Sequence, residues 1–366
     1  MSSPDTSGGI LSIDLAALVS NWQMLKSQLE SADCAVALKA DAYGIGASRA
    51  VVELARAGCR EFFVALIDEG ISLRRVLGEA GLDGHIHILS GAMAPATMTR
   101  HRLIPVLNSL NDIETWKNAA PGLAADIHID TGMSRLGLPP EELQILANDR
   151  AILKGLNISY VMSHLACAED RDTAMNDQQL QRFKQALKLF PGCRASLANS
   201  SGIFLGPEYH FDLARPGVSL YGVNPTPGKP NPMAQVIRLQ GKILQIRDVD
   251  SPQSVGYGAT YRVERKGRIA TVGVGYADGY LRSLSNCGFG YLGQQRLPLV
   301  GRVSMDLITF DVSEVPQSEV HPGAMIDLIG PHNPIDDIAD AASIIGYEIL
   351  TALGSRLHRV YENGTA

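Results

Sequence analysis

The sequence has no apolar run that approaches the roughly 18 residues a membrane-spanning helix needs. Its first ten residues, MSSPDTSGGI, lack a basic segment followed by an apolar one, so no secretory signal is indicated. Basic residues are not in excess either, because the formal net charge is −6, which argues against a nucleic-acid or anionic-membrane surface. We therefore expect a cytoplasmic protein that binds neither nucleic acid nor membrane.

Cysteine is scarce, and its five positions are irregularly spaced with no C-x-x-C pair. An odd number in this pattern indicates neither a disulfide framework nor a zinc site, so we expect no metal cofactor. What is present is ordinary for a globular protein, with 45% hydrophobic and 19% charged residues. A length of 366 residues leaves room for about two domains.

Short apolar stretches alternate with helical patterns through the first part of the chain. Helical periodicity at 67–77, 141–147 and 177–189 falls between strand candidates. Eight such strands are predicted, at 35–38, 62–66, 85–89, 104–107, 124–129, 156–162, 195–198 and 213–220. Eight strands alternating with helices predict an α/β fold whose N-terminal part is a (β/α)8 TIM-like barrel.

A proline-rich segment at 224–232, NPTPGKPNP, marks a connector because proline fixes φ and cannot donate to a strand ladder. Beyond it the pattern changes to short strands with one clear helix at 335–345. The strands are predicted at 236–247, 267–274, 297–303, 307–312 and 324–329. We expect a barrel domain at 1–232, with residues 1–13 able to pair with the second domain, and a C-terminal mostly-β domain at 233–366.

Lys39 ends the first predicted barrel strand and precedes a turn with Tyr43, Gly44 and Gly46. In an α/β barrel the carboxyl ends of the strands carry the chemistry. A partly desolvated lysine there can lose its charge and act as an amine nucleophile or a base. Taken alone, a surface lysine at the end of a strand is the commoner interpretation.

Further polar residues follow the later barrel strands. Arg135 lies in a glycine-bounded loop, His164 follows Ser163, and the segment ANSSG ends at Gly202. Small hydroxyl groups and exposed backbone N–H groups after strands seven and eight are typical of a barrel's phosphate site. A phosphate site that faces a lysine fits pyridoxal phosphate held as a Schiff base.

Seven segments in this order resemble the alanine racemase family, the fold-type III enzymes that use pyridoxal phosphate, and the resemblance runs over nearly the whole chain. The segments are VALKADAYGIG, IDTGMSRLG, ANSSG, RPGVSLYG, VGYGATY, VGYADGY and GRVSMD. Each segment alone is a weak signal, whereas seven in the family's order are specific. The resemblance implies an enzyme that interconverts L-alanine and D-alanine.

The resemblance also implies residue roles. Lys39 would bind pyridoxal phosphate and act as one base, and Tyr257 of the partner subunit would act as the other in a homodimer with shared active sites. Arg215 would face the pyridine nitrogen. The remaining expected roles are phosphate binding by Tyr43, Ser200, Gly217, Val218 and Tyr347, carboxylate binding by Arg135 and Met305, a polar network with His164, and an entrance beside Tyr276 and Arg282.

These roles agree with the chemistry of racemisation. A proton leaves one face of the α-carbon and another returns on the opposite face, so two bases are simpler than one. Lysine and tyrosine suit this task if their pKa values are lowered, lysine by desolvation and tyrosine by nearby cations. Guanidinium only donates, so Arg215 would keep the pyridine nitrogen unprotonated and disfavour transamination.

Two positions differ from many relatives. His128 occupies a place where relatives carry a lysine whose carbamate braces the substrate-binding arginine. We therefore expect Arg135 to be braced by His128, by an anion such as chloride, or by another side chain. Ser196 stands where several relatives have a histidine near the pyridine-side arginine, so a shorter network around Arg215 is expected.

The main hypothesis is an alanine racemase that supplies D-alanine for peptidoglycan. One alternative is a racemase of another or broader amino-acid specificity. A second is a non-catalytic pyridoxal-phosphate homeostasis protein, which would lack residues corresponding to 233–366. A third is a decarboxylase of the same fold type, which would be longer.

Overall fold

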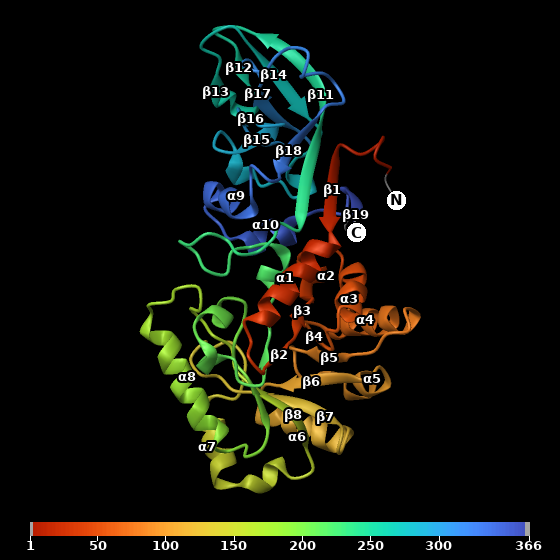
Figure 1. Ribbon diagram of the computed structural model, residues 1–366, viewed down its shortest axis with the longest axis vertical. Coiled ribbons are helices and arrows are strands. Elements are labelled where there is room, and N and C mark those ends of the chain that lie inside the picture. Colours follow the sequence, from red (N-terminus) through yellow and green to blue (C-terminus); the bar gives the residue numbers. More distant parts are fainter. Residues whose placement is uncertain (1–2, 363–366) are drawn as a thin grey trace. The chain divides into compact units, whose positions relative to one another are not determined.

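A computed structural model describes residues 3–362. The described chain forms two compact units. The barrel unit comprises Val19–Leu220 and Asn224–Met233, and the C-terminal unit comprises the residues up to Leu18, Tyr221–Val223 and those from Ala234 on (Figure 1). No helix among the described residues is both long and apolar enough to cross a membrane.

The barrel unit is built on a seven-stranded parallel sheet in which each strand pairs with the next along the chain. Its strands are β3 (Val36–Ala37), β4 (Glu61–Val64), β5 (His85–Ile88), β6 (Leu103–Leu107), β7 (Ala124–His128), β8 (Asn157–Met162) and β9 (Arg194–Ser196). Seven of the eight predicted strands therefore correspond to this sheet. The expected α/β barrel is confirmed.

The predicted eighth strand is much shorter than expected. β10 (Leu213–Ala214) pairs with β2 (Asp33–Cys34), and a 3-10 helix, η4 (Val218–Tyr221), replaces the rest of the prediction. Pro216 has no N–H to donate, which ends the ladder. The segment still closes the barrel, because Arg215 N–H donates to the Ala198 carbonyl and Ala37 N–H donates to the Pro216 carbonyl.

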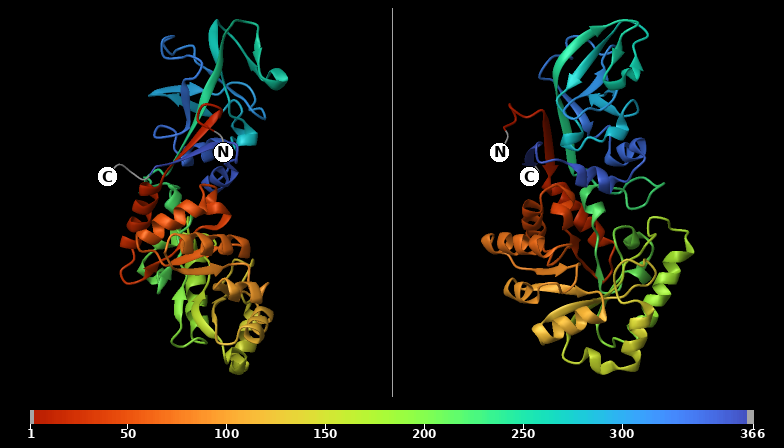
Figure 2. Two further views of the ribbon diagram at one scale, coloured as in Figure 1. Left: turned by 90° about the vertical axis from the view of Figure 1, so that its right-hand side faces the viewer. Right: turned by 180° about the vertical axis from the view of Figure 1, so that it is seen from behind.

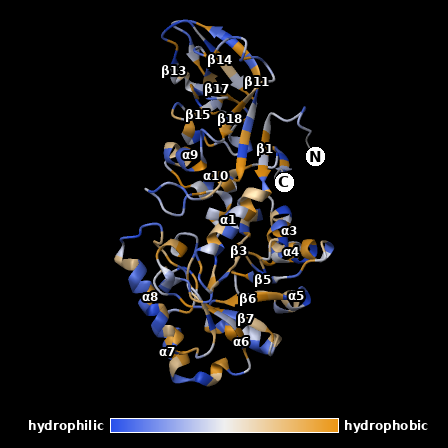
Figure 3. Cartoon of the chain, viewed as in Figure 1, coloured by the Kyte–Doolittle hydropathy of each residue, from blue (hydrophilic) through white to orange (hydrophobic). Residues whose placement is uncertain are grey.

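Helices cover the outside of this sheet (Figure 1). The described helices of the N-terminal half are α1 (Leu15–Ser27), α2 (Lys39–Tyr43), α3 (Ala47–Arg56), α4 (Ile67–Glu79), α5 (Pro95–Arg100), α6 (Leu110–Ala119), α7 (Pro140–Asn148) and α8 (Ala174–Leu187). Figure 3 shows β6 as apolar, whereas α8 carries many hydrophilic residues. This contrast is expected for strands enclosed by amphipathic helices.

The C-terminal unit is organised around the long strand β11 (Ile237–Val249). β1 (Gly9–Asp14) lies beside it, antiparallel to β11 and parallel to β19 (His358–Glu362) (Figure 2). The remaining strands are β12 (Ser254–Val255), β13 (Tyr261–Arg262), β14 (Gly267–Val272), β15 (Phe289–Leu292), β16 (Gln295–Pro298), β17 (Ile308–Asp311) and β18 (Met325–Ile329). The expected mostly-β character of this region is confirmed.

Two details of the C-terminal prediction were wrong. The helix predicted at 335–345 ends earlier, as α9 (Ile335–Ala342), because Ser343 adopts a left-handed conformation, and a second helix follows as α10 (Gly346–Ala352). The strand predicted at 297–303 is β16, which ends at Pro298. Gly301 then has a φ of 80°, a turn conformation that extended strand residues do not adopt.

Candidate active site

Lys39 begins an unusual turn at the carboxyl end of β3. The four residues after it, Ala40 to Tyr43, all have φ between 53° and 54°, so α2 is a short left-handed turn. Left-handed conformations cost non-glycine residues on the order of 1–2 kcal/mol each. Such strain is found mainly at functional sites, and here it directly follows Lys39.

Glu69, in the first turn of α4, stabilises this strained turn. One of its carboxylate oxygens accepts a hydrogen bond from Ala40 N–H at 2.6 Å, and the other accepts from Ala65 N–H at 2.9 Å and Leu66 N–H at 3.0 Å. The same carboxylate acts on Lys39. Desolvation lowers the pKa of the half-buried Lys39 and the Arg135 charge lowers it further, while Glu69 opposes both.

A small cradle lies beside Lys39 after the last barrel strands. The buried Ser200 hydroxyl accepts hydrogen bonds from Gly217 N–H at 2.9 Å and from Ser219 N–H at 3.3 Å. A Cβ atom at Gly217 would come within 2.4 Å of the Tyr43 hydroxyl oxygen, so only glycine fits between them. Converging hydroxyl and backbone N–H groups are what a phosphate group requires.

Ser219 adds a further feature to this cradle. Its hydroxyl is buried and has no hydrogen-bond partner within residues 3–362. A buried polar group without a partner is uncommon unless a ligand or water completes it. The residues present therefore fit the phosphate of pyridoxal phosphate.

Arg215 is buried at the barrel's centre, with 7% of its surface exposed. It donates to the Ser163 carbonyl at 2.5 Å and to the hydroxyl of Ser196. Burial lowers the pKa of Arg215 to about 10, so the guanidinium remains charged at neutral pH. Ser196 thus provides the short network that was expected where relatives have a histidine.

Arg135 lies in an exposed loop whose shape is set by Asp130. The Asp130 carboxylate accepts hydrogen bonds from the N–H groups of Gly132, Met133 and Ser134. Arg135 makes no hydrogen bond or ion pair with other described residues. It nevertheless lies near enough to lower the pKa values of Lys39 and His164.

His128 does not form the expected hydrogen bond to Arg135. His128 Nδ1 lies 2.8 Å from the Asn108 side-chain oxygen. Burial and the Arg215 charge lower the pKa of His128 to about 4, so the ring is neutral and carries no charge of its own. Desolvation, with Arg215 and Arg135, likewise keeps His164 uncharged by lowering its pKa.

Tyr257 is one of the most exposed large side chains of the C-terminal unit, at 74%. It begins the short 3-10 helix η5 (Tyr257–Ala259), between Gly256 and Gly258, whose positive φ values of 75° and 71° shape the turn. Tyr257 lines a cavity of about 410 Å³ together with Arg302 and Leu307. Tyr257 is therefore accessible both to solvent and to the cavity.

Met305 and Tyr276 lie close to each other in the same unit. Tyr276 N–H donates to the Ser304 carbonyl and Ala277 N–H donates to the Met305 carbonyl, both at 3.0 Å. Arg356 fixes these loops by pairing with Asp278 at 2.8 Å and Asp306 at 2.7 Å. Met305 is 53% exposed.

Tyr347, in α10, is 41% exposed.

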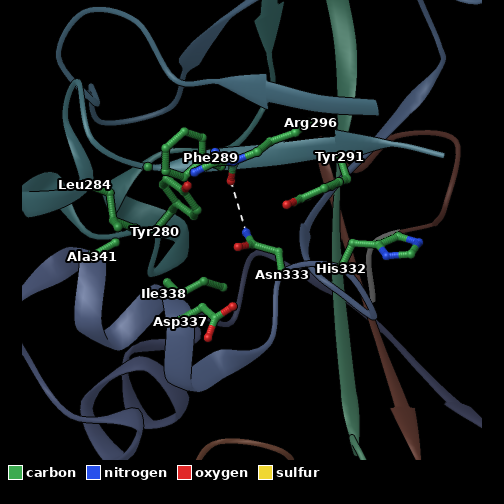
Figure 4. A pocket seen from close by; sticks show the side chains of 11 residues that line it. Tyr280, Leu284, Phe289, Tyr291, Arg296, His332, Asn333, Asp337, Ile338 and Ala341 are labelled. Carbon is green, nitrogen blue, oxygen red and sulfur yellow. Dashed lines mark hydrogen bonds between the residues drawn. The ribbon is translucent and has the colours of Figure 1, made fainter. Parts of the chain in front are cut away.

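A second cavity of about 210 Å³ lies in the C-terminal unit between β15, β16 and α9 (Figure 4). Tyr280, Phe289 and Asn333 line it, and Asn333 Nδ2 donates to the Phe289 carbonyl at 3.1 Å. None of the residues expected at the active site belongs to this cavity. Nor do residues 3–362 contain a group of His, Cys, Asp and Glu side chains arranged to hold a metal ion.

Several site residues were not found from the sequence. Glu69 is one of two acids that begin a helix, and nothing in the sequence shows that it folds back onto residue 40. Ser219 is a single polar residue within an apolar segment, and Asn108 directly follows the apolar strand β6. Their burial, which is the informative property, appears only in the folded chain.

Comparison with known proteins identifies relatives over the full length. The family profile described as alanine racemase, N-terminal domain, matches residues 13–225, and that described as alanine racemase, C-terminal domain, matches residues 236–361. An alanine racemase of Rhodospirillum rubrum is 50% identical over 368 residues, covering 99% of this chain and 98% of the relative. A catabolic alanine racemase of Mesorhizobium japonicum is 45% identical, covering 98% and 94%.

Solved structures give the same result. The crystal structure of alanine racemase from Bartonella henselae with covalently bound pyridoxal phosphate has a TM-score of 0.92 and 40% identity, covering 97% of this chain and 100% of that one. The biosynthetic alanine racemase of Pseudomonas aeruginosa has a TM-score of 0.88 and 31% identity, covering 97% and 99%.

Proposed function

The chain belongs to the alanine racemase family, and on that premise we propose that Lys39 and Tyr257 are its two proton-transferring bases, with Tyr257 supplied by a second copy of the chain. Its activity is the interconversion of L-alanine and D-alanine with pyridoxal phosphate as cofactor. The convergence of Lys39, Arg215 and the Ser200–Gly217 cradle at the carboxyl ends of the barrel strands carries this proposal.

Pyridoxal phosphate supplies an electron sink that acidifies the proton on the substrate's α-carbon. Lys39 would hold it through the side-chain amine. Ser200, Tyr43 and the backbone N–H groups of Gly217 and Val218 would hold its phosphate, with Tyr347 as a further expected contact. The cradle supports this role, because a side chain at Gly217 would displace the Tyr43 hydroxyl from it.

Lys39 has the electrostatic environment of a base. Its amine is half-buried next to Arg135, and both effects lower its pKa, so a larger fraction is neutral near neutral pH than for a lysine in water. A neutral amine accepts the α-carbon proton on one face of the substrate. Tyr257 would carry out the same proton transfer on the opposite face.

Arg215 would hold the pyridine nitrogen as an acceptor. Its guanidinium remains charged and offers only N–H donors, so a ring nitrogen opposite it is bound without its own proton. Bound in this way, the ring would be a moderate electron sink, which would favour rapid return of the proton. Arg135 and the backbone of Met305 would bind the substrate's carboxylate, and His164 would lie uncharged in the polar network.

Mixing two inactive variants tests the shared site. Lys39→Ala and Tyr257→Phe each lose racemisation if both bases are needed. In a 1:1 mixed refolding, half of the dimers carry one chain of each kind, and each of these has one intact site if the bases come from different copies. The activity regained is then about a quarter of wild type.

Each outcome of the mixing experiment has a distinct meaning. If Lys39 and Tyr257 of the same copy formed one site, every mixed dimer would remain inactive, and the shared-site proposal would be wrong. Substantial activity of Tyr257→Phe alone would instead exclude Tyr257 as a base. Refolding each variant separately is the control for incomplete inactivation.

We also infer that the enzyme supplies D-alanine for peptidoglycan in the cytoplasm as a homodimer. Deleting the encoding gene is expected to make growth depend on added D-alanine, and unchanged growth would contradict this role. Turnover of serine, lysine and arginine measured beside alanine tests the alternative of a broader specificity.

A further inference from the structure

The interior of the barrel contains a hydrogen-bonded network of three ionisable side chains, Glu61, His87 and Asp126. His87 is fully buried, with Nδ1 at 2.6 Å from an Asp126 oxygen and Nε2 at 2.7 Å from a Glu61 oxygen. Glu61, His87 and Asp126 come from three strands, β4, β5 and β7. Barrel interiors are normally filled by branched apolar side chains, and burying ions costs several kcal/mol each unless they are well paired.

His87 is held as an imidazolium. Both ring nitrogens face carboxylates, so both donate. Burial alone would lower the pKa of His87, but Asp126 and Glu61 outweigh it and raise the pKa to about 9. Burial acts against ionisation of Glu61 too, yet hydrogen bonds from His85 and His87 lower its pKa to about 2. The imidazolium ring of His87 is therefore held between a carboxylate on each side.

The Glu61–His87–Asp126 network is coupled to Arg215 in two ways. The His87 ring is stacked on Phe63, with the centroids 4.3 Å apart and an interplanar angle of 12°. The Arg215 guanidinium carbon lies 5.9 Å from the centroid of the same Phe63 ring, within the range of a cation–π contact. Asp126 is also the charge that opposes the effect of burial on the pKa of Arg215.

Arg215 has few other means of charge compensation. The hydrogen bonds that it donates to Ser196 and Ser163 end on uncharged oxygens. Meanwhile one oxygen of Asp126, Oδ1, is buried without a hydrogen-bond partner among residues 3–362. A purely structural network would be expected to satisfy this oxygen. The Asp126 carboxylate is instead suited to stabilise the buried Arg215 guanidinium through its charge.

We propose that His87 is a positioning residue for Arg215, clamped between Glu61 and Asp126 so that the Phe63 ring and the Asp126 charge hold the guanidinium against the cofactor's pyridine nitrogen. This inference rests on the proposed function, in which Arg215 has that role. The network makes no direct contact with substrate. Its effect is on the orientation of the one group that keeps the pyridine nitrogen unprotonated.

A displaced Arg215 changes which reaction follows proton removal. If water reaches the pyridine nitrogen and protonates it, the ring becomes a stronger electron sink. The proton then adds more often to the cofactor's former aldehyde carbon than to the substrate's α-carbon. Water would then hydrolyse the carbon–nitrogen double bond, so that the substrate would leave as pyruvate with the oxygen of that water and the cofactor would keep the amino group as pyridoxamine phosphate. The network therefore acts on reaction fidelity as well as on rate.

The test compares His87→Gln with Tyr160→Phe in the complete enzyme. Tyr160 belongs to the same interior layer, packs its ring against His87 at 6.0 Å and donates to Glu61 at 3.4 Å. Phenylalanine keeps that packing and leaves His87 between its two carboxylates. For each protein we would measure pyruvate formed per alanine racemised, the dissociation constant for pyridoxal phosphate, and the thermal unfolding of the cofactor-free form.

His87→Gln is expected to raise the pyruvate yield per racemisation by about tenfold, which corresponds to about 1.4 kcal/mol in relative barrier height. Tyr160→Phe is expected to leave that ratio unchanged. A folded His87→Gln protein with the wild-type ratio would overturn the proposal, since a structural role changes stability and not this ratio. If His87→Gln does not fold, Glu61→Gln replaces it, with the same direction expected and the same result overturning the proposal.

An Arg215→Lys variant separates this inference from the function on which it rests. If Arg215→Lys leaves the pyruvate ratio unchanged, the proposed role of Arg215 is wrong and His87 has nothing to position. If Arg215→Lys raises the ratio and His87→Gln does not, only the positioning role of His87 fails. Nitrogen-15 NMR of labelled histidine adds a readout independent of activity, because a neutral His87 ring at pH 7.5 would contradict the clamp.

Discussion

At the scale of single residues, the pKa of Lys39 is set by neighbours that act in opposite directions. Desolvation and Arg135 lower it, and Glu69 raises it. The neutral amine is the form that reacts with the aldehyde of pyridoxal phosphate, so cofactor capture by the cofactor-free protein should speed up as pH rises through this pKa. The pKa of Lys39 therefore depends on charges carried by other parts of the barrel unit, the helix α4 and the loop of Arg135.

Replacing Arg135 by glutamine should move the pH profile of cofactor capture to higher pH. The substitution removes a positive charge that lowers the pKa of Lys39, so the amine loses its proton only at higher pH. The measurement is the rate of growth of the cofactor's visible absorbance band against pH. Arg182→Gln is the matched control, because Arg182 bonds the Thr131 carbonyl and does not act on Lys39. An unshifted Arg135→Gln profile would exclude this electrostatic coupling.

Gly217 is a second position at which a single added atom should change the affinity for pyridoxal phosphate. A methyl group there would lie 2.4 Å from the Tyr43 hydroxyl oxygen and would narrow the cradle. We expect Gly217→Ala to weaken pyridoxal-phosphate binding by about tenfold or more, as a fluorescence titration would measure. Gly78→Ala in α4, where a methyl group would meet no atom within 4 Å and the backbone is helical, is the comparison. Equal affinities would argue against a phosphate at Gly217.

At the scale of elements, the left-handed turn α2 stores strain that an ordinary helix does not. Ala40 is exposed with a φ of 53°, so glycine there would relieve roughly 1 kcal/mol of strain and offset its greater entropy in the unfolded chain. We expect Ala40→Gly to equal or exceed wild type in free energy of unfolding. Ala147→Gly, in the right-handed helix α7, should instead lose about 0.5–1 kcal/mol. Denaturant titrations of both decide the matter.

The strands β5 and β7 carry two histidines, the buried His87 and the half-buried His128, with opposite pH behaviour. The pKa of His87 is raised to about 9, so its stabilisation is complete below the ordinary value of 6.5 and is lost as pH rises through 9. The pKa of His128 is lowered to about 4, so its contribution is lost as pH falls from 6.5 to 4. The stability gap between wild type and His87→Gln should therefore shrink from pH 6.5 to 9. A constant gap would show that His87 is not protonated in the native state.

At the scale of the whole molecule, the C-terminal unit exposes apolar side chains near Tyr257. Tyr276, Met305 and Leu307 are between 39% and 53% exposed, which is unusual for large apolar groups gathered on neighbouring loops. The proposed dimer would cover them. Light scattering is then expected to give twice the 39.3 kDa of one chain.

A charge in this surface should separate dimerisation from cofactor binding. We expect Leu307→Asp to yield monomers that bind pyridoxal phosphate in the barrel unit but racemise alanine poorly, since Tyr257 of the second copy is missing. Leu244→Asp is the matched control, an exposed leucine of the same unit in β11. A fully active Leu307→Asp monomer would contradict a site shared between copies.

Much of the fold could be predicted because its signals are local. Alternating apolar stretches gave seven sheet strands, and Lys39, Arg135 and His164 follow strands as the pattern indicates. The errors lie where a turn interrupts an apolar pattern that otherwise predicts one continuous strand or helix. Pro216 and the turn that follows shortened the eighth strand, and a left-handed Ser343 divided one predicted helix into two. Pro216 was visible in the sequence as a residue that cannot donate to a ladder, whereas the left-handed conformation of Ser343 has no distinct pattern in residue type.

The sequence by itself determined the order of strands and helices and the family, and it indicated the residues that we propose hold a phosphate or transfer a proton, because these depend on spacing and residue chemistry. Only the tertiary structure decided which charges surround them. Glu69 is 29 residues from Ala40, and Asp126 is 39 from His87, yet each pair is hydrogen bonded. Burial and long-range pairing, which set pKa values and orientation, exist only once the barrel has closed.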